Sequence, residues 1–173
     1  TCTPASCRRR SELLARSLRE GGRDVVTGSA AWRGADADDG ASRQCGLALA
    51  FRPDLAVMWL GLNDLLRLGF DVDGVGTTLR TTADRLRSGG ARLLPASMPL
   101  PDDVLALPGW SVRRLSSRVA ALNESVAALA QDVGAVHLDV GATLARVGRE
   151  AMLGPDGIHF TELRHHAVAT DYL

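Results

Sequence analysis

A histidine with a nearby carboxylate is the first feature of this sequence that could perform chemistry. Asp156 stands three residues before His159, and on a turn this spacing lets the carboxylate reach the imidazole Nδ1 and fix its tautomer. The Nε2 atom of His159 is then free to act as a general base. The alternative is a plain turn built by Pro155, Asp156 and Gly157, with a histidine that merely follows it.

Two further residues could stabilise negative charge on a reacting oxygen. Asn63 comes shortly after a strongly apolar run, and its side-chain amide could donate to an oxyanion, a role worth about 3 to 4 kcal/mol per donor. Gly34 follows another expected strand, and its backbone N–H could point into the same crevice. The alternatives are a helix N-cap for Asn63 and a plain turn for Gly34.

The remaining histidines and the cysteines show no catalytic or metal-binding pattern. His137 lies inside an apolar run and is interpreted as a core residue with its hydrogen bonds satisfied, whereas His165 and His166 form a solvated or packing pair. The cysteines are odd in number and lack metal-ligand spacing, which predicts unpaired thiols. They are Cys2, Cys7 and Cys45. We therefore expect neither a metal nor a cofactor.

Short apolar runs alternate with helical patterns along the chain, which is typical of parallel strands joined by crossover helices. Strands are expected near residues 24–30, 54–60, 91–97 and 135–140, and helices over 11–18, 45–51, 77–88, 111–132 and 161–169. This order predicts a three-layer α/β/α sandwich with a parallel, doubly wound, flavodoxin-like sheet. Ligands bind such sheets outside the carboxyl ends of the strands, where Asn63 and Gly34 are expected.

The composition limits the classes of function that fit. The 173 residues suit one domain, and 20 basic residues balance 20 acidic ones, which argues against a nucleic-acid partner. No apolar run approaches the roughly 20 residues that span a bilayer. No signal peptide is visible in these residues, so the location is left open with the cytoplasm slightly favoured.

In combination and order, these motifs resemble the sequence blocks of the GDSL/SGNH hydrolase family, and in particular its small bacterial esterase-like members. Ala31-Trp32-Arg33-Gly34-Ala35 is similar to the second block, and Arg52-Pro53-Asp54-Leu55 running into Gly61-Leu62-Asn63-Asp64 is similar to the third. Asp156-Gly157-Ile158-His159 resembles the fifth block. The likeness covers about residues 11–169 and includes Leu65-Leu66-Arg67 and the stretch from Arg118 to Asn123.

This resemblance implies an activity and assigns roles. A member of the family hydrolyses ester bonds of a small-molecule substrate, with a serine as nucleophile. Carried over position by position, His159 is the base, Asp156 its partner, and Asn63 and Gly34 the oxyanion donors. The competing function is a non-catalytic module that holds a small polar or acyl ligand in the same crevice. A flavodoxin-like nucleotide binder is disfavoured because no expected strand leads into a glycine-rich phosphate loop.

The sequence departs from the family pattern at its start, because the Gly-Asp-Ser block is absent. Residues 1–10 form neither an apolar strand nor a Gly-Asp-Ser turn, and neither Ser6 nor Ser11 follows an apolar strand. No nucleophile is therefore identified in this chain. We expect a single domain over residues 1–173 that is N-terminally incomplete, lacks the first central strand of the sheet and is an impaired catalyst.

Overall fold

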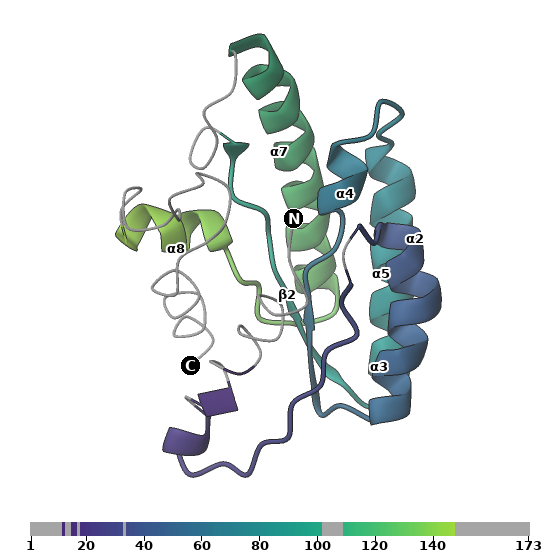
Figure 1. Ribbon diagram of the computed structural model, residues 1–173, viewed down its shortest axis with the longest axis vertical. Coiled ribbons are helices and arrows are strands. Elements are labelled where there is room, and N and C mark those ends of the chain that lie inside the picture. The colour runs from purple at the N-terminus through teal and green to yellow at the C-terminus, as the bar shows by residue number, and fades with distance from the viewer. Residues whose placement is uncertain (1–11, 13–14, 17, 33, 102–108, 148–173) are drawn as a thin grey trace.

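The computed structural model describes residues 12, 15–16, 18–32, 34–101 and 109–147 of the chain. A continuous helical stretch is followed by two strands that alternate with further helices (Figure 1). The elements are α2 (Ala37–Asp39), the π-helix η1 (Gly40–Gln44), α3 (Cys45–Phe51), β1 (Leu55–Met58), α4 (Leu62–Leu65), α5 (Val72–Ser88), β2 (Arg92–Pro95), α7 (Gly109–Asp132) and α8 (Val140–Val147).

The two strands are parallel, as the alternation of apolar runs and helices predicts. Leu55 lies opposite Arg92, and the register runs on to Met58 opposite Pro95. A single parallel bridge then joins Ala96 to Leu138. The protein is thus α/β with a small parallel sheet of two strands, and the expected run over 135–140 contributes one bridge rather than a strand.

The expected strand over residues 24–30 is wrong. These residues have irregular backbone, and the Val26 side chain is 78% exposed. Val25 and Val26 favour extended backbone, but a strand also needs a hydrogen-bonded neighbour. In the described part of the chain β1 pairs with β2 alone, so no ladder reaches this segment. With the run over 135–140 reduced to one bridge, the described residues hold two strands where the sequence predicts four.

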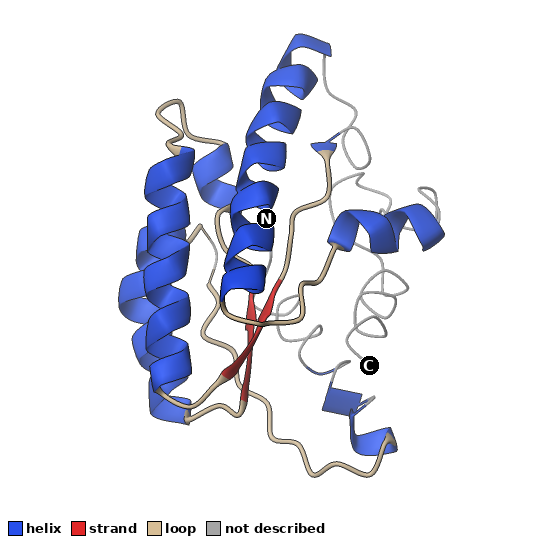
Figure 2. Ribbon diagram, turned by 180° about the vertical axis from the view of Figure 1, so that it is seen from behind, coloured by secondary structure: helices blue, strands red, loops and turns tan. Residues whose placement is uncertain are grey.

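One face of the sheet carries the main hydrophobic core. Met58 of β1 and Leu93 of β2 belong to one buried cluster with side chains from α5 and α7. The amphipathic pattern of α5 explains this packing, because Val75, Leu79, Ala83 and Leu86 recur at helical spacing and are all buried. Figure 2 shows α5 and α7 next to each other, and the two helices pack together.

Glycine and proline end the helices where the sequence predicts. The first helical segment ends at Gly21 and Gly22, where the Gly22 N–H donates to the Arg19 carbonyl at 2.9 Å. Helix α3 ends at Arg52, whose φ of +51° lies in the left-handed region, directly before Pro53. Helix α5 ends at Gly89, whose N–H donates to the Arg85 carbonyl at 3.1 Å. Residue type alone therefore locates these boundaries.

Several helical elements differ from expectation: α2 and η1 were not predicted, and α4, α5 and α8 differ as follows. Helix α5 begins at Val72 rather than at residue 77, because Asp71 caps it by accepting from the Asp73 N–H at 3.1 Å. Helix α4 is a single turn, too short to give a periodic signal. Helix α8 begins at Val140, where a strand was expected, because Asp139 Oδ1 accepts the Ala142 N–H at 3.0 Å and so caps the helix.

Several expectations fall outside the described residues. These are the helix over 161–169, Asp156, His159, His165, His166, Cys2 and Cys7. Within the described residues, no helix combines the length and the hydropathy that a membrane crossing requires.

Candidate functional site

The structure brings the two expected oxyanion donors, Asn63 and Gly34, to the same place. Asn63 Nδ2 donates to the carbonyl oxygen of Ala35 at 2.6 Å, and Ala35 directly follows Gly34. Gly34 has a φ of +80°, a conformation that favours glycine, and no atom of the described residues lies within 4 Å of a Cβ added there. The Asn63 amide therefore lies directly beside this turn.

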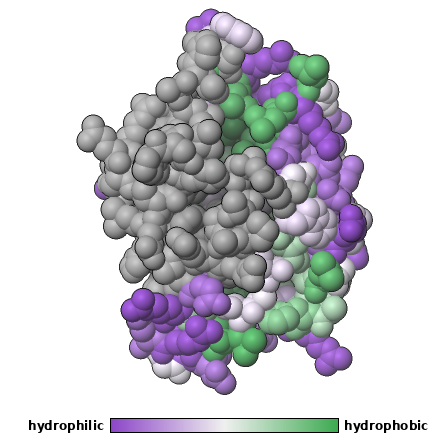
Figure 3. Space-filling model, in the orientation of Figure 1, coloured by the Kyte–Doolittle hydropathy of each residue, from purple (hydrophilic) through white to green (hydrophobic). Residues whose placement is uncertain are grey.

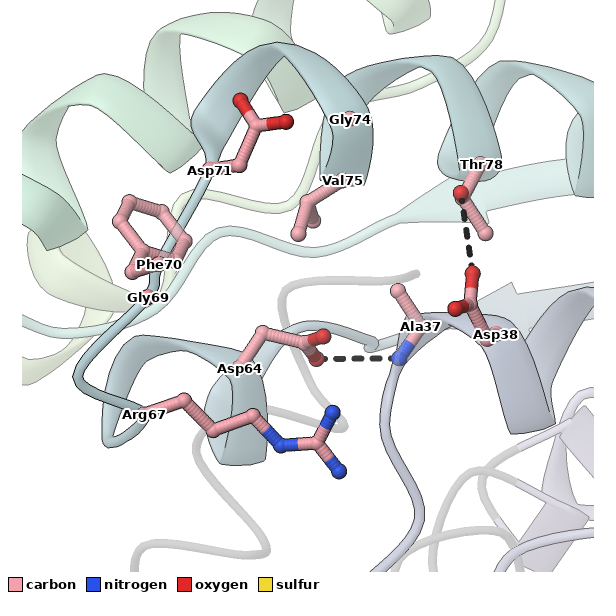
Figure 4. A pocket seen from close by; sticks show the side chains of 10 residues that line it. All are labelled: Ala37, Asp38, Asp64, Arg67, Gly69, Phe70, Asp71, Gly74, Val75 and Thr78. Atoms are coloured by element: carbon pink, nitrogen blue, oxygen red, sulfur yellow. Dashed lines mark hydrogen bonds between the residues drawn. The ribbon is translucent and has the colours of Figure 1, made fainter.

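Asp64 and Arg67, which follow Asn63 in the sequence, bind the residues that follow the Gly34 turn. Asp64 Oδ2 accepts the Ala37 N–H at 3.0 Å, as the dashed line in Figure 4 shows. Arg67 Nη2 forms an ion pair with Asp36 Oδ2 at 2.6 Å. Three contacts therefore link α4 and the loop after it to the residues that follow Gly34.

Asp36 also starts the helical stretch that continues from the turn. It caps α2 by accepting the Asp39 N–H at 2.9 Å, and Asp39 in return accepts the Asp36 N–H at 3.4 Å. This reciprocal arrangement is a capping box formed by two aspartates three residues apart. The Asp-x-x-Asp spacing was visible in the sequence, and it could have located this helix start.

Burial raises the pKa of the Asp64 carboxyl above its ordinary value of 3.8. The negative charge of Asp36 acts in the same direction, whereas the hydrogen bond from the Ala37 amide and the positive charge of Arg67 lower the pKa. Burial is the largest cause because it removes water from the charged form of the carboxyl. The carboxyl therefore holds its proton to a higher pH in the folded chain than in the unfolded one.

The carboxyl ends of the two strands are joined at this edge of the sheet. Asn123 of α7 pairs with the backbone of Met98: its Oδ1 accepts the Met98 N–H at 2.7 Å and its Nδ2 donates to the Met98 carbonyl at 2.8 Å. The Trp59 indole N–H contacts the Met98 sulfur at 2.7 Å. Sequence reasoning did not assign a role to Asn123, because its partner lies 25 residues away.

Among the described serines, Ser97 follows a strand, but it is not placed to act as a nucleophile. Its side chain is only 2% exposed, and its Oγ both donates to the Leu138 carbonyl and accepts the Val140 N–H, each at 3.3 Å. These bonds join β2 to the start of α8. Ser97 is therefore a structural link within the fold, and the described residues supply no strand-end serine that is free to attack.

A cavity of about 240 Å³ lies behind the turn, between α2, the α4–α5 loop and α5 (Figure 4). Its lining residues are Ala37, Asp38, Asp64, Arg67, Gly69, Phe70, Asp71, Gly74, Val75 and Thr78. Neither Gly34 nor Asn63 lines it. The cavity is therefore separate from the surface on which the two expected oxyanion donors meet.

Two minor expectations have different outcomes. Cys45 is a free thiol, as predicted, and it is buried in the core. The interpretation of His137 as a satisfied core residue is wrong, since its Nε2 is buried and has no hydrogen-bond partner among the residues that the structure describes. Asp156 and His159 lie outside the described residues, so their distance from Asn63 stays a prediction.

Comparison with solved structures shows the same fold in several ester hydrolases. The structure of TesA is 26% identical, with a TM-score of 0.74, over 96% of this chain and 86% of that chain. A lipase/acylhydrolase from Enterococcus faecalis is 21% identical, with a TM-score of 0.76, over 93% of this chain and 80% of that chain. The psychrotrophic esterase EstA from Pseudoalteromonas sp. is 19% identical, with a TM-score of 0.69, over 93% and 81%.

A comparison with curated protein sequences gives no match. The model of the GDSL-like lipase/acylhydrolase family, in contrast, matches residues 1–167. The match covers nearly the whole chain and includes the Gly34 turn, the Asn63 helix and the segment with Asp156 and His159. The chain therefore belongs to the GDSL-like lipase/acylhydrolase family.

Proposed function

We propose that this protein hydrolyses carboxylic esters of small molecules, with the Gly34 N–H and the Asn63 amide as its oxyanion donors. The observation that carries the proposal is the bond from Asn63 Nδ2 to the Ala35 carbonyl, because it holds the amide beside the Gly34 turn. An NH₂ group has two hydrogens. In the part of the chain that the structure describes, the second hydrogen of Asn63 has no acceptor, so it can serve an oxyanion.

The acid–base part of the site is assigned to His159 and Asp156. In this proposal a serine attacks the acyl carbonyl while His159 Nε2 takes the serine proton. His159 then returns the proton to the alcohol that leaves, and water repeats the sequence to release the acid. Asp156 fixes the tautomer of His159. Charge develops on the carbonyl oxygen in both halves of the reaction, where Gly34 and Asn63 stabilise it.

The nucleophile is proposed to come from a Gly-Asp-Ser strand that is not among these 173 residues. Ser97 is buried and bonded on both sides, and the other serines of the described residues do not end a strand. The exposed face of β1 supports this proposal. Val57 is 46% exposed, and among the described elements β1 pairs with β2 alone, so no described strand lies at its other edge.

The experiment that tests the oxyanion role is Asn63→Ala in a form of the chain joined to a Gly-Asp-Ser strand. Removing one oxyanion donor lowers kcat by about 10² to 10³. KM for p-nitrophenyl acetate is expected to change little, because the donor acts mainly on the transition state. Asn63→Asp keeps the size but replaces the donor with an acceptor, so it should lose at least as much. An unchanged kcat in both variants would remove Asn63 from the mechanism.

A further inference from the structure

The single turn of α4 is held against α7 at both of its ends. At the first end, Gly61 lies so close to α7 that a Cβ there would come within 2.8 Å of Leu122 Cδ2. At the second end, Arg118 Nη1 donates to the carbonyls of Leu65 and Arg67, each at 2.7 Å, and Nη2 donates to the Leu68 carbonyl at 3.2 Å. Arg118 and Leu122 are one helical turn apart on α7.

Arg118 donates hydrogen bonds to backbone carbonyls at the end of α4 that a one-turn helix cannot pair by itself. The last carbonyls of any helix lack partners within it, and in α4 they make up most of the element. A guanidinium has five N–H donors in a rigid planar fork, so one side chain can bind several carbonyls at once. The Arg118 guanidinium also lies 5.4 Å from the centre of the Phe70 ring, which fixes it from the loop side.

The opposite side of α4 contacts the Gly34 turn. Asn63 bonds to Ala35, Asp64 bonds to Ala37, and Arg67 pairs with Asp36. Helix α4 therefore lies between α7 and the Gly34 turn. A displacement of its C-terminal end, which Arg118 holds, would displace Asn63 as well. The atoms that Arg118 binds begin two residues after Asn63, at the Leu65 carbonyl.

We propose that Arg118 is a positioning residue that sets the place of the Asn63 amide by holding the C-terminal end of α4. This inference rests on the proposed function only for its catalytic consequence. Its structural part is that the Asn63–Ala35 hydrogen bond depends on Arg118. An arginine at this place acts through α4 and touches no substrate.

The structural part can be tested on the 173-residue chain by NMR. We expect Arg118→Met to accelerate the exchange of the Asn63 side-chain amide protons with water by about tenfold, because the bond to Ala35 opens more often. Asn123 is the internal control, since its amide bonds to the Met98 carbonyl and not to α4. Arg80→Met is the matched variant, because Arg80 pairs with Asp132 between α5 and α7 at the surface.

The outcomes of this experiment separate positioning from general loosening. Faster exchange of Asn63 alone, in Arg118→Met and not in Arg80→Met, supports the proposal. Unchanged Asn63 exchange, or equally faster exchange of Asn63 and Asn123, overturns it. If Arg118→Met does not fold, Arg118→Lys carries the same test. A lysine keeps the charge but not the fork, so a smaller acceleration is expected.

The catalytic consequence is tested with the form that is joined to a Gly-Asp-Ser strand. Misplacing a group by about 1 Å can lower the rate up to about 10²-fold, so Arg118→Met should lower kcat by up to that factor with little change in KM. In the Asn63→Ala background, the same substitution should have almost no further effect. If Arg118→Met lowers kcat by the same factor in the Asn63→Ala background, the positioning role is overturned. An unchanged kcat in Asn63→Ala alone instead overturns the proposed function, while the NMR result still decides the structural part.

Discussion

Gly61 lies against Leu122 in a backbone conformation that few other residues adopt. Its φ is +100°, and a Cβ on this residue would come within 2.8 Å of Leu122 Cδ2. Gly61 follows β1 by three residues and is the N-cap of α4, so it sets how closely α4, which contains Asn63, can approach α7. A side chain at this position therefore has both a conformational and a steric cost.

We expect Gly61→Ala to lower the free energy of unfolding by about 2 to 4 kcal/mol, from backbone strain and overpacking together. Gly90→Ala is the matched control. Gly90 also has a positive φ, +96°, but a Cβ there would meet no atom within 4 Å. Urea denaturation measures both variants, and the difference between them reports the contact with Leu122. Equal losses in the two variants would show that this contact contributes nothing.

The raised pKa of Asp64 predicts a pH dependence of stability. The folded chain keeps the Asp64 proton to a higher pH than the unfolded chain, so ionisation of this group opposes folding. Relative to Asp64→Asn, the free energy of unfolding of the natural chain should fall as the pH rises from below 3.8 through the folded pKa. Above the folded pKa, the difference in free energy of unfolding between the natural chain and Asp64→Asn should stay constant.

Asp64→Asn is the suitable reference because its amide oxygen can still accept the Ala37 N–H while carrying no charge. The measurement is urea denaturation of both proteins at several pH values from the acid range to neutrality. If the free energy of unfolding of the natural chain instead rises with pH relative to that of Asp64→Asn, the pKa of Asp64 is lowered in the folded chain. The hydrogen bond from the Ala37 amide and the positive charge of Arg67 would then outweigh burial.

Much of the fold was predictable from local residue types. Gly21 and Gly22, Arg52 before Pro53, and Gly89 end helices where expected, because these residues act through their own backbone preferences. The positions of β1 and β2 were likewise predicted from their apolar runs. The segment over 24–30 was wrongly predicted as a strand, because a strand also needs a partner, which Val25 and Val26 cannot supply.

Two residues of the candidate site could be proposed from the sequence, whereas the contacts that connect them could not. Asn63 and Gly34 stood out because amide and glycine groups suit an oxyanion, and the structure places them together. Arg118 was not assigned a role, because the carbonyls that it binds are 50 to 53 residues away in sequence. No local pattern encodes a contact of this range, so packing between helices has to be known first.

The open side of β1 predicts self-association of the 173-residue chain. Leu55 and Val57 are both partly exposed, and β1 pairs on one side only among the described elements. Hydrophobic side chains scattered over the described surface are visible in Figure 3, but an exposed strand also offers backbone donors and acceptors to another chain. Val57→Lys should therefore reduce association in sedimentation velocity.

Leu47→Lys is the control for this experiment. Leu47 is 58% exposed on α3, so the substitution removes a similar apolar surface from a helix whose backbone bonds are already made. We expect Leu47→Lys to associate as the natural chain does. A natural chain that is monomeric, or an equal effect of the two lysines, would contradict a role for the β1 edge.

In the proposed mechanism, this chain provides the base and the oxyanion donors of an ester hydrolase but not its nucleophile. This can be tested by comparing p-nitrophenyl acetate hydrolysis by the 173-residue chain with that by the form joined to a Gly-Asp-Ser strand. We expect only the joined form to turn over rapidly and His159→Ala to abolish this activity. Without the nucleophile, a site of this kind retains a rate enhancement of about 10³ to 10⁴ over water. Equal, His159-dependent turnover by both forms would instead show that a serine within residues 1–173 is the nucleophile, and the proposal would be wrong.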